Sequence, residues 1–198
     1  MKKIIVLVCL FGVHFGIFAQ STLEVKGYLG VSSTQLARKA DLVGVGGVEM
    51  NNLTEFGFLL SKRISQKLRF TAGVGYSFSE VKYQPPFCSS CGEEFNSGQI
   101  SDFKMLSFPI YAEYTLGKYF YAAAGPIIDL ELSNEETYSD QSGIGYLIGL
   151  GARWQAEKFT FSIFPNYKRH GMIPFDNSSK FKHVLQEIGV QAGVRYSF

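Results

Sequence analysis

After residue 19, the chain lacks both a long hydrophobic run and an excess of charge of either sign. No segment beyond that point has the roughly 18 consecutive apolar residues of a membrane-spanning helix, so we expect no such helix there. The full sequence has 19 Lys and Arg against 17 Asp and Glu, and without Lys2 and Lys3 both counts are 17. A chain without a basic excess gives no electrostatic support for nucleic-acid binding, and no nucleic-acid partner is expected.

Cysteine is scarce as well, with three residues in the whole sequence. Cys88 and Cys91 form a Cys-Ser-Ser-Cys motif, which we interpret as a small local disulfide made in an oxidising compartment. A redox-active pair would open a helix in a thioredoxin-like fold, whereas Gly92 and two glutamates follow here in a loop pattern. A metal site needs about four ligands, and only Glu93 and Glu94 lie nearby. No metal and no cofactor are expected.

The N-terminal segment has the pattern of a secretory signal peptide. A short basic stretch, Met1-Lys2-Lys3, precedes an almost unbroken apolar run over residues 4–18, and Ala19-Gln20 offers a cleavage point. The sequence therefore predicts a signal peptide over residues 1–19 and one domain over residues 20–198.

Alternating apolar and polar residues are what the rest of the chain has in abundance. In the last segment Ile188, Val190, Ala192 and Val194 share one strand face, while Gln191 and Arg195 share the other. Eight segments repeat this period of two, over residues 23–31, 55–64, 68–79, 106–116, 120–131, 144–154, 159–168 and 188–198. Aromatic residues make up 15% of the chain and glycines number 21, as suits a barrel with aromatic rims and a crowded interior.

The connections between these segments alternate between short and long. Short ones fall at residues 65–67, 117–118 and 155–158, and long ones near residues 33–54, 84–102, 133–142 and 170–183. This arrangement predicts an all-β fold, an eight-stranded antiparallel up-and-down transmembrane β-barrel with both termini in the periplasm. A soluble lipocalin-like barrel is the main structural alternative, and in it the apolar face would point inward.

The polar face carries charges that a narrow barrel must neutralise. We expect Arg69, Arg153 and Arg195 to pair with Glu113 and other interior acids and to plug the lumen. A conducting pore is the alternative for the same charges. Three prolines inside the strand patterns, Pro109, Pro126 and Pro165, remove ladder donors and predict bulges or interrupted pairing.

Two motifs resemble those of known proteins. Tyr196-Ser-Phe198 looks like the C-terminal signal that the assembly machinery of bacterial outer-membrane barrels reads. Leu106-Ser-Phe-Pro-Ile-Tyr-Ala-Glu-Tyr114 followed by Phe120-Tyr-Ala-Ala-Ala-Gly-Pro126 resembles the PorT-like outer-membrane β-barrel family of Bacteroidetes. The resemblance implies a place in the bacterial outer membrane, contact with its lipid and with the barrel-assembly machinery, and no catalytic residues. One branch of that family is tied to protein secretion.

The expected role is therefore non-enzymatic: a barrel that presents four outer loops to an extracellular or periplasmic protein partner whose identity the sequence does not give. One alternative is a lipid-modifying enzyme using His170 or His183, with Ser178, Ser179 and Asp176 in the same loop. A Ser-His hydrolase needs its base held against the nucleophile, and no strand places Ser beside His at fixed spacing. The remaining alternative is the narrow channel.

Overall fold

The computed structural model describes residues 23–38, 47–85, 98–133, 140–175 and 183–198. The predicted signal peptide and the pair Cys88 and Cys91 lie outside these ranges. Within the described ranges, no helix is long and apolar enough to cross a membrane.

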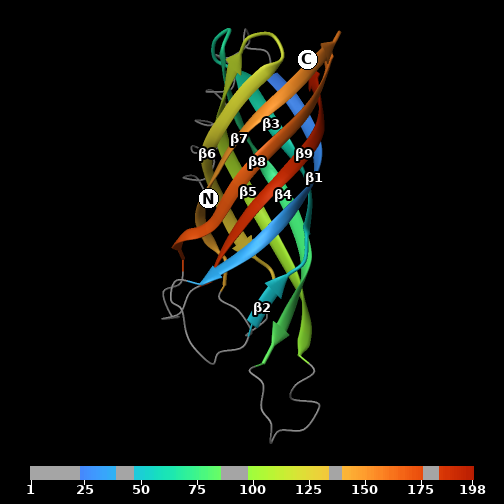
Figure 1. The fold of residues 1–198 in the computed structure, drawn as a ribbon. Coiled ribbons are helices and arrows are strands. Elements are labelled where there is room, and N and C mark those ends of the chain that lie inside the picture. Colours follow the sequence, from blue (N-terminus) through green and yellow to red (C-terminus); the bar gives the residue numbers. More distant parts are fainter. Residues whose placement is uncertain (1–22, 39–46, 86–97, 134–139, 176–182) are drawn as a thin grey trace, which may run out of the picture.

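Eight antiparallel strands close into a barrel (Figure 1). They are β1 (Leu23–Arg38), β3 (Leu53–Arg63), β4 (Leu68–Gln84), β5 (Gln99–Leu116), β6 (Phe120–Glu131), β7 (Gly143–Ala156), β8 (Phe159–Pro174) and β9 (His183–Ser197). Each strand pairs with the next along the chain, and β1 pairs with β9 from Glu24↔Ser197 to Arg38↔His183 to close the ring. The predicted eight-stranded up-and-down barrel is confirmed.

A ninth strand was not predicted. β2 (Gly47–Met50) pairs with the end of β4, from Gly47↔Gln84 to Met50↔Val81. The pairing of β4 with β3 stops at Thr54↔Phe78, so the last part of β4 has free ladder groups on that side. β2 satisfies them, which protects an edge that would otherwise be unpaired.

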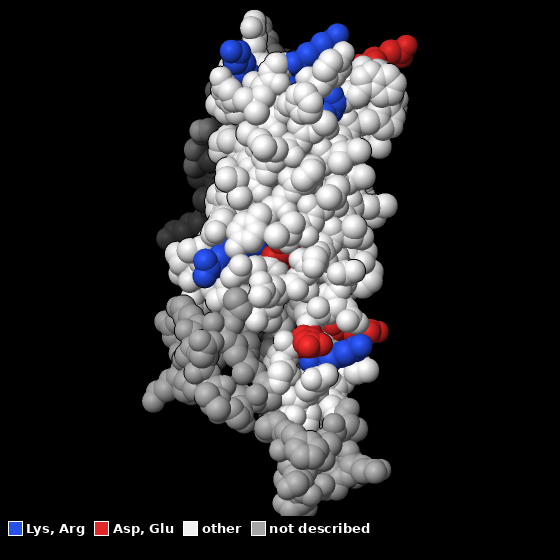
Figure 2. All heavy atoms as spheres, in the orientation of Figure 1, with Lys and Arg blue, Asp and Glu red and all other residues white. Residues whose placement is uncertain are grey.

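The two faces of the wall are as predicted. Large apolar side chains point outward, and Leu29, Phe58 and Ile188 are 68%, 65% and 72% exposed. Charged side chains point inward, where Glu24, Lys26 and Glu113 are each 1% exposed. On the face drawn in Figure 2, a band of uncharged side chains separates the charges gathered toward the two ends. The soluble alternative requires the opposite arrangement, so the structure rules it out.

Interrupted pairing occurs at all three prolines. The β4–β5 pairing skips Phe108 and Pro109, the β5–β6 pairing skips Gly125 and Pro126, and the β7–β8 pairing skips Phe164 and Pro165. Each proline is paired on its other side, as in Pro165↔Val190. The prolines thus remove local ladder contacts without changing the register.

The register shifts elsewhere, in the pairing of β7 with β8. The partners change from Ile144↔Ile173 to Tyr146↔Arg169, so β8 contains extra residues at this point. Gly171 lies in this bulge with φ +57°, in the left-handed region that favours glycine. His170 is the first residue of this unpaired stretch, and it is 1% exposed in the barrel interior.

Candidate functional site

The barrel interior is the only region in which the described chain gathers buried charges, and it is layered along the barrel axis. Near the end with the short turns lies the inner charge cluster, formed by Glu24, Arg69, Glu113 and Arg195 from β1, β4, β5 and β9. Arg69 Nε lies 2.8 Å from Glu24 Oε2, and its Nη1 lies 2.9 Å from Glu113 Oε2. Arg195 Nη2 lies 2.6 Å from Glu113 Oε1, and its Nη1 lies 3.4 Å from Glu24 Oε2. Two acids therefore bridge two arginines in a closed ring of contacts.

Neighbouring polar groups complete the inner charge cluster. Thr71 donates to Glu113 at 3.3 Å, and Arg63 donates to Glu24 at 3.1 Å. Lys26 is fully buried beside them, and Gly193 leaves room for its stem, because a Cβ there would collide with Lys26 Cε. Charges in a narrow interior require such partners, since removing them from water is costly.

Arg153 departs from the sequence expectation. Arg69 and Arg195 do contact Glu113, but Arg153 makes no ion pair within the described residues. Its Nη2 donates to Thr115 Oγ1 at 2.7 Å, and its guanidinium lies 5.7 Å from the centre of the Tyr121 ring. Its Nη1 is buried and has no hydrogen-bond partner in the described part of the chain. Two other arginines already occupy the oxygens of Glu113, which leaves Arg153 to the hydroxyl.

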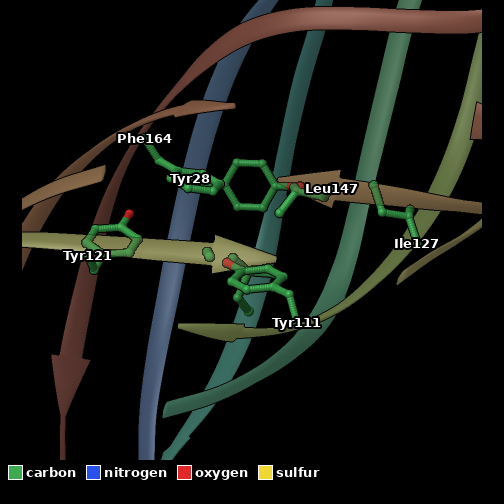
Figure 3. Packing of buried hydrophobic residues seen from close by; sticks show 8 residues of the cluster. Tyr28, Tyr111, Tyr121, Ile127, Leu147 and Phe164 are labelled. Carbon is green, nitrogen blue, oxygen red and sulfur yellow. The ribbon is translucent and has the colours of Figure 1, made fainter. Parts of the chain in front are cut away.

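An aromatic layer lies beyond the inner charge cluster (Figure 3). The Phe164 ring stacks on Tyr121 with centroids 5.6 Å apart and on Tyr111 at 6.4 Å. Facing glycines make room for these rings, since a Cβ at Gly151 would collide with Tyr121. Aliphatic and further aromatic residues fill the rest of the layer, namely Tyr28, Leu59, Ala123, Ile127 and Leu147.

The outer charge network follows and consists of Glu55, Asp129, Lys168, His170 and Glu187. Lys168 Nζ lies 2.7 Å from Glu55 Oε2 and 3.1 Å from Glu187 Oε2. His170 Nε2 lies 2.7 Å from Glu187 Oε1, and its Nδ1 lies 2.7 Å from Asp129 Oδ2.

Two neutral side chains complete this network. Ser107 donates to the second oxygen of Asp129 at 2.7 Å, and Gln191 donates to Glu55 at 3.1 Å. The outer charge network therefore links five strands of the wall, from β3 and β5 through β6 to β8 and β9.

An apolar plug closes the end with the long connections. It consists of Leu53, Val81, Phe103, Met105 and Leu185, each no more than 1% exposed. Gln141 accepts from the backbone N–H of Leu185 at 2.9 Å and is itself buried. Between the aromatic layer and the outer charge network, the described residues leave a cavity of about 10 Å³, room for at most about one water molecule.

His170 does not lie at the outer rim, where the enzymatic alternative places it. The sequence pattern predicts a position at the edge of a loop for His170, but the residue lies in β8, is 1% exposed and contacts two carboxylates. The backbone of His183 begins β9, and Asp176, Ser178 and Ser179 lie outside the described residues. Sequence reasoning missed the outer charge network, although the period of two already put Glu55, Asp129 and Lys168 on the inward face.

The aromatic residues of the C-terminal motif lie at the short-turn end. Tyr196 contacts the Phe159 ring at 5.3 Å and the Phe198 ring at 5.2 Å between centroids. Phe198 is 71% exposed, and its backbone N–H donates to Leu23 O at 3.3 Å. The two rings therefore join the rim of the barrel at the seam between β1, β8 and β9.

Comparisons with known proteins agree with this architecture. A family model described as outer membrane protein beta-barrel domain matches residues 18–198. No curated protein matches the chain.

Three solved outer-membrane proteins share the fold at low sequence identity. OprG from Pseudomonas aeruginosa is 12% identical with a TM-score of 0.53, covering 90% of this chain and 96% of its own. AlkL, solved in lipid bilayers, is 15% identical with a TM-score of 0.56 and covers 90% of each chain. Neisserial surface protein A is 17% identical with a TM-score of 0.54, covering 89% of this chain and 97% of its own. At these identities the likeness shows the fold alone.

Proposed function

This chain belongs to the outer membrane protein β-barrel domain family and resides in the bacterial outer membrane, and from that premise we propose that it is a non-enzymatic interaction protein. Its barrel serves as a closed support in the outer-membrane lipid. Its long connections face the cell exterior, because short turns face the periplasm in this class of barrel. The partner is a protein at the cell surface.

The filled lumen is the observation that carries this proposal. The inner charge cluster, the aromatic layer, the outer charge network and the apolar plug occupy the interior in succession. Each layer is contributed by several strands, so no single side-chain movement opens a path. A barrel of eight strands has an interior just wide enough for its own side chains. This filling favours a support role over a channel.

The environment of His170 supports the non-enzymatic assignment. A general base must reach the group it deprotonates. His170 has both ring nitrogens within 2.7 Å of carboxylate oxygens and is buried between the aromatic layer and the apolar plug. This environment suits a structural ion pair better than a base at a lipid surface.

Strand length supports an outward-facing role. A tilted membrane strand needs about 9–11 residues, whereas β4 has 17 and β5 has 18. The excess lies at the end with the long connections, where β2 adds to the β4 edge (Figure 1). The β4–β5 hairpin therefore stands above the membrane as a rigid base for the connection between its strands.

Photo-crosslinking on intact cells tests the proposal. A photoreactive residue at Lys82, which is exposed on the extension of β4, is expected to give a discrete crosslinked protein. The same residue at Gln66, in the short turn between β3 and β4, is the control on the opposite side. Planar-bilayer recordings of the purified protein are expected to show no conductance steps. Regular steps together with an absence of surface crosslinks would contradict the proposal and favour the narrow channel.

Two finer assignments extend this proposal. Participation in protein secretion is suggested by the PorT-like resemblance, and comparison of the secreted proteins of wild-type and deletion strains tests it. Recognition by the barrel-assembly machinery is assigned to Tyr196 and Phe198. Replacing Phe198 by Asp is expected to lower the amount of folded barrel in the outer membrane, and unchanged levels would contradict this assignment.

A further inference from the structure

The mouth of the lumen at the short-turn end is a pocket of about 310 Å³, which we call the periplasmic vestibule. The turn between β3 and β4, the turn between β5 and β6, and the facing ends of β7 and β8 form its wall. The inner charge cluster and then the aromatic layer fill the lumen behind it. Short turns face the periplasm in this class of barrel, so a ligand enters the vestibule from that side.

The charges that line the periplasmic vestibule are all positive. Among the described residues that line it, none is Asp or Glu, and five are cations, namely Arg63, Lys67, Arg69, Lys118 and Arg153. Glu157, exposed in the turn between β7 and β8, is not one of the lining residues. The low-dielectric walls of a narrow cleft concentrate the field of like charges, so this lining favours an anion.

The acids behind the vestibule do not neutralise its cations. Both acids of the inner charge cluster already contact arginines of the wall, at distances of 2.6–3.4 Å. Within the described ranges, Lys67, Lys118 and Arg153 make no ion pair; Lys118 lies 5.2 Å from a tyrosine ring centre, and Arg153 is bonded to a threonine hydroxyl. Residues 1–22 contain no Asp or Glu that could supply the missing charge. An excess of positive charge therefore remains at this mouth.

Two neighbouring turns carry the accessible cations of the vestibule. Lys67 precedes β4 and Lys118 lies between β5 and β6, and both residues are exposed. The backbone N–H of Thr115 donates to Lys67 O at 2.8 Å, which holds the two turns side by side. The two ammonium groups are therefore carried on adjoining parts of one rim.

Neutral polar side chains complete the lining. Their hydroxyl and amide groups suit hydrogen bonds with the hydroxyls of a ligand; they belong to Ser65, Gln66, Thr115, Gln155 and Thr160. The volume of the vestibule lies at the lower end of the range for small-molecule sites, about 300–1,000 Å³. Its size and lining together suit a small anion that carries hydroxyl groups.

We propose that the periplasmic vestibule binds a small phosphate monoester of the sugar phosphate class, with the phosphate against Lys67 and Lys118 and the sugar on the neutral lining. A phosphate monoester carries a charge of about −1.5 to −2 at neutral pH, so it offsets the positive excess better than a carboxylate does. Lysine binds phosphate as a point charge, and the arginines behind it add to the attraction. This site is independent of the proposed surface partner, which lies at the other end of the barrel.

Titration calorimetry on the protein purified from outer membranes in a non-ionic detergent tests the proposal. Glucose 6-phosphate is the probe and is expected to bind with saturation. Lys67→Gln and Lys118→Gln are each expected to weaken binding roughly 3-fold, and the double variant roughly 10-fold, as for exposed ion pairs that act independently. Both lysines lie in exposed turns, so their replacement leaves the barrel interior intact.

Lys158→Gln is the matched control, because it removes the same charge at the same end of the barrel. Lys158 lies in the turn between β7 and β8, does not line the vestibule, and has its Nζ 5.9 Å from the centre of the Tyr196 ring. This variant is expected to bind glucose 6-phosphate as the wild type does. If Lys158→Gln weakens binding as much as Lys67→Gln and Lys118→Gln do, the effect is one of overall charge and the proposal is overturned.

Three further ligands define the chemistry of the site. Glucose lacks the phosphate and is expected not to bind. Glucuronate, which has one carboxylate, and inorganic phosphate, which has no sugar, are each expected to bind several-fold more weakly than glucose 6-phosphate. The absence of saturable binding of glucose 6-phosphate, or equal affinity for either of these two anions, would overturn the assignment to a sugar phosphate.

Discussion

At the scale of single residues, stability depends on buried charges that have no water to solvate them. Glu113 is 1% exposed and is shared by Arg69 and Arg195. Replacing Glu113 with Ala leaves both arginines short of a partner, and we expect a loss of about 3–5 kcal/mol in the free energy of unfolding. Urea unfolding in lipid, followed by the fluorescence of the single tryptophan, measures this. Glu49→Ala, at an exposed position of β2, is the control and is expected to change little. A loss in the free energy of unfolding no larger than that of Glu49→Ala would contradict the role of the inner charge cluster.

Adjacent positions on β9 should differ in how strongly polar substitution destabilises the barrel. Ala192 faces lipid near the middle of the strand, and Ala192→Arg is expected to cost about 2–4 kcal/mol of folding free energy. Gln191 faces the lumen and donates to Glu55 at 3.1 Å, so Gln191→Asn should cost only about 1 kcal/mol through this hydrogen bond. The same unfolding assay compares them. If Ala192→Arg is tolerated and Gln191→Asn is strongly destabilising, the assignment of the two faces of β9 is inverted.

Residue identity predicts which face a side chain occupies, but not which partner it meets. The period of two placed Arg69, Glu113, Arg153 and Arg195 in the lumen, and two of the three arginines contact Glu113. Arg153 instead bonds to Thr115, because the relative height of side chains depends on the stagger between strands. That stagger is set by how the whole barrel closes, so it cannot be read from any single segment of the sequence.

At the scale of elements, the bulge in β8 is the point where the alternating pattern changes phase. Gly171 has φ +57°, and the nearest atom to a Cβ placed there is 3.6 Å away, so strain rather than collision governs substitution. We expect Gly171→Ala to cost about 1–2 kcal/mol in unfolding free energy. Gly27→Ala in β1, with an ordinary φ and a Cβ 3.7 Å from Phe58, should be close to neutral. Equal effects of the two substitutions would contradict the strained bulge.

This bulge also explains why the sequence pattern does not identify His170 as a strand residue. Alternation fails just after it, at Gly171, and the pattern alone cannot separate a bulge from the end of a strand. The extended ends of β4 and β5, and the short β2, escaped prediction for a related reason. Outside the lipid a strand need not keep one face apolar, so its sequence loses the period that identifies it.

At the scale of the whole molecule, the closure of β1 on β9 satisfies the last free edge. In lipid an open edge leaves backbone groups without partners, at several kcal/mol each. The eight strands of the barrel wall, the alternation of connection lengths and the polarity of the two faces were all predictable, because each follows from the demands of the bilayer. The layered filling of the lumen was predictable only in outline, since the plug brings Leu53 of β3 together with Leu185 of β9, which are far apart in the sequence.

Residue-by-residue accessibility along β9 tests the central claim most directly. Single cysteines at positions 188–195, in a chain carrying Cys88→Ser and Cys91→Ser, are spin-labelled after refolding into lipid vesicles. Collisions with oxygen, which concentrates in lipid, are expected to peak at Ile188, Val190, Ala192 and Val194 and to fall at the positions between them. A water-soluble nickel quencher should reach none of the four peaks. Peaks at the lumen positions, or strong nickel access to the apolar face, would contradict a barrel that turns this face to lipid and keeps its charges inside.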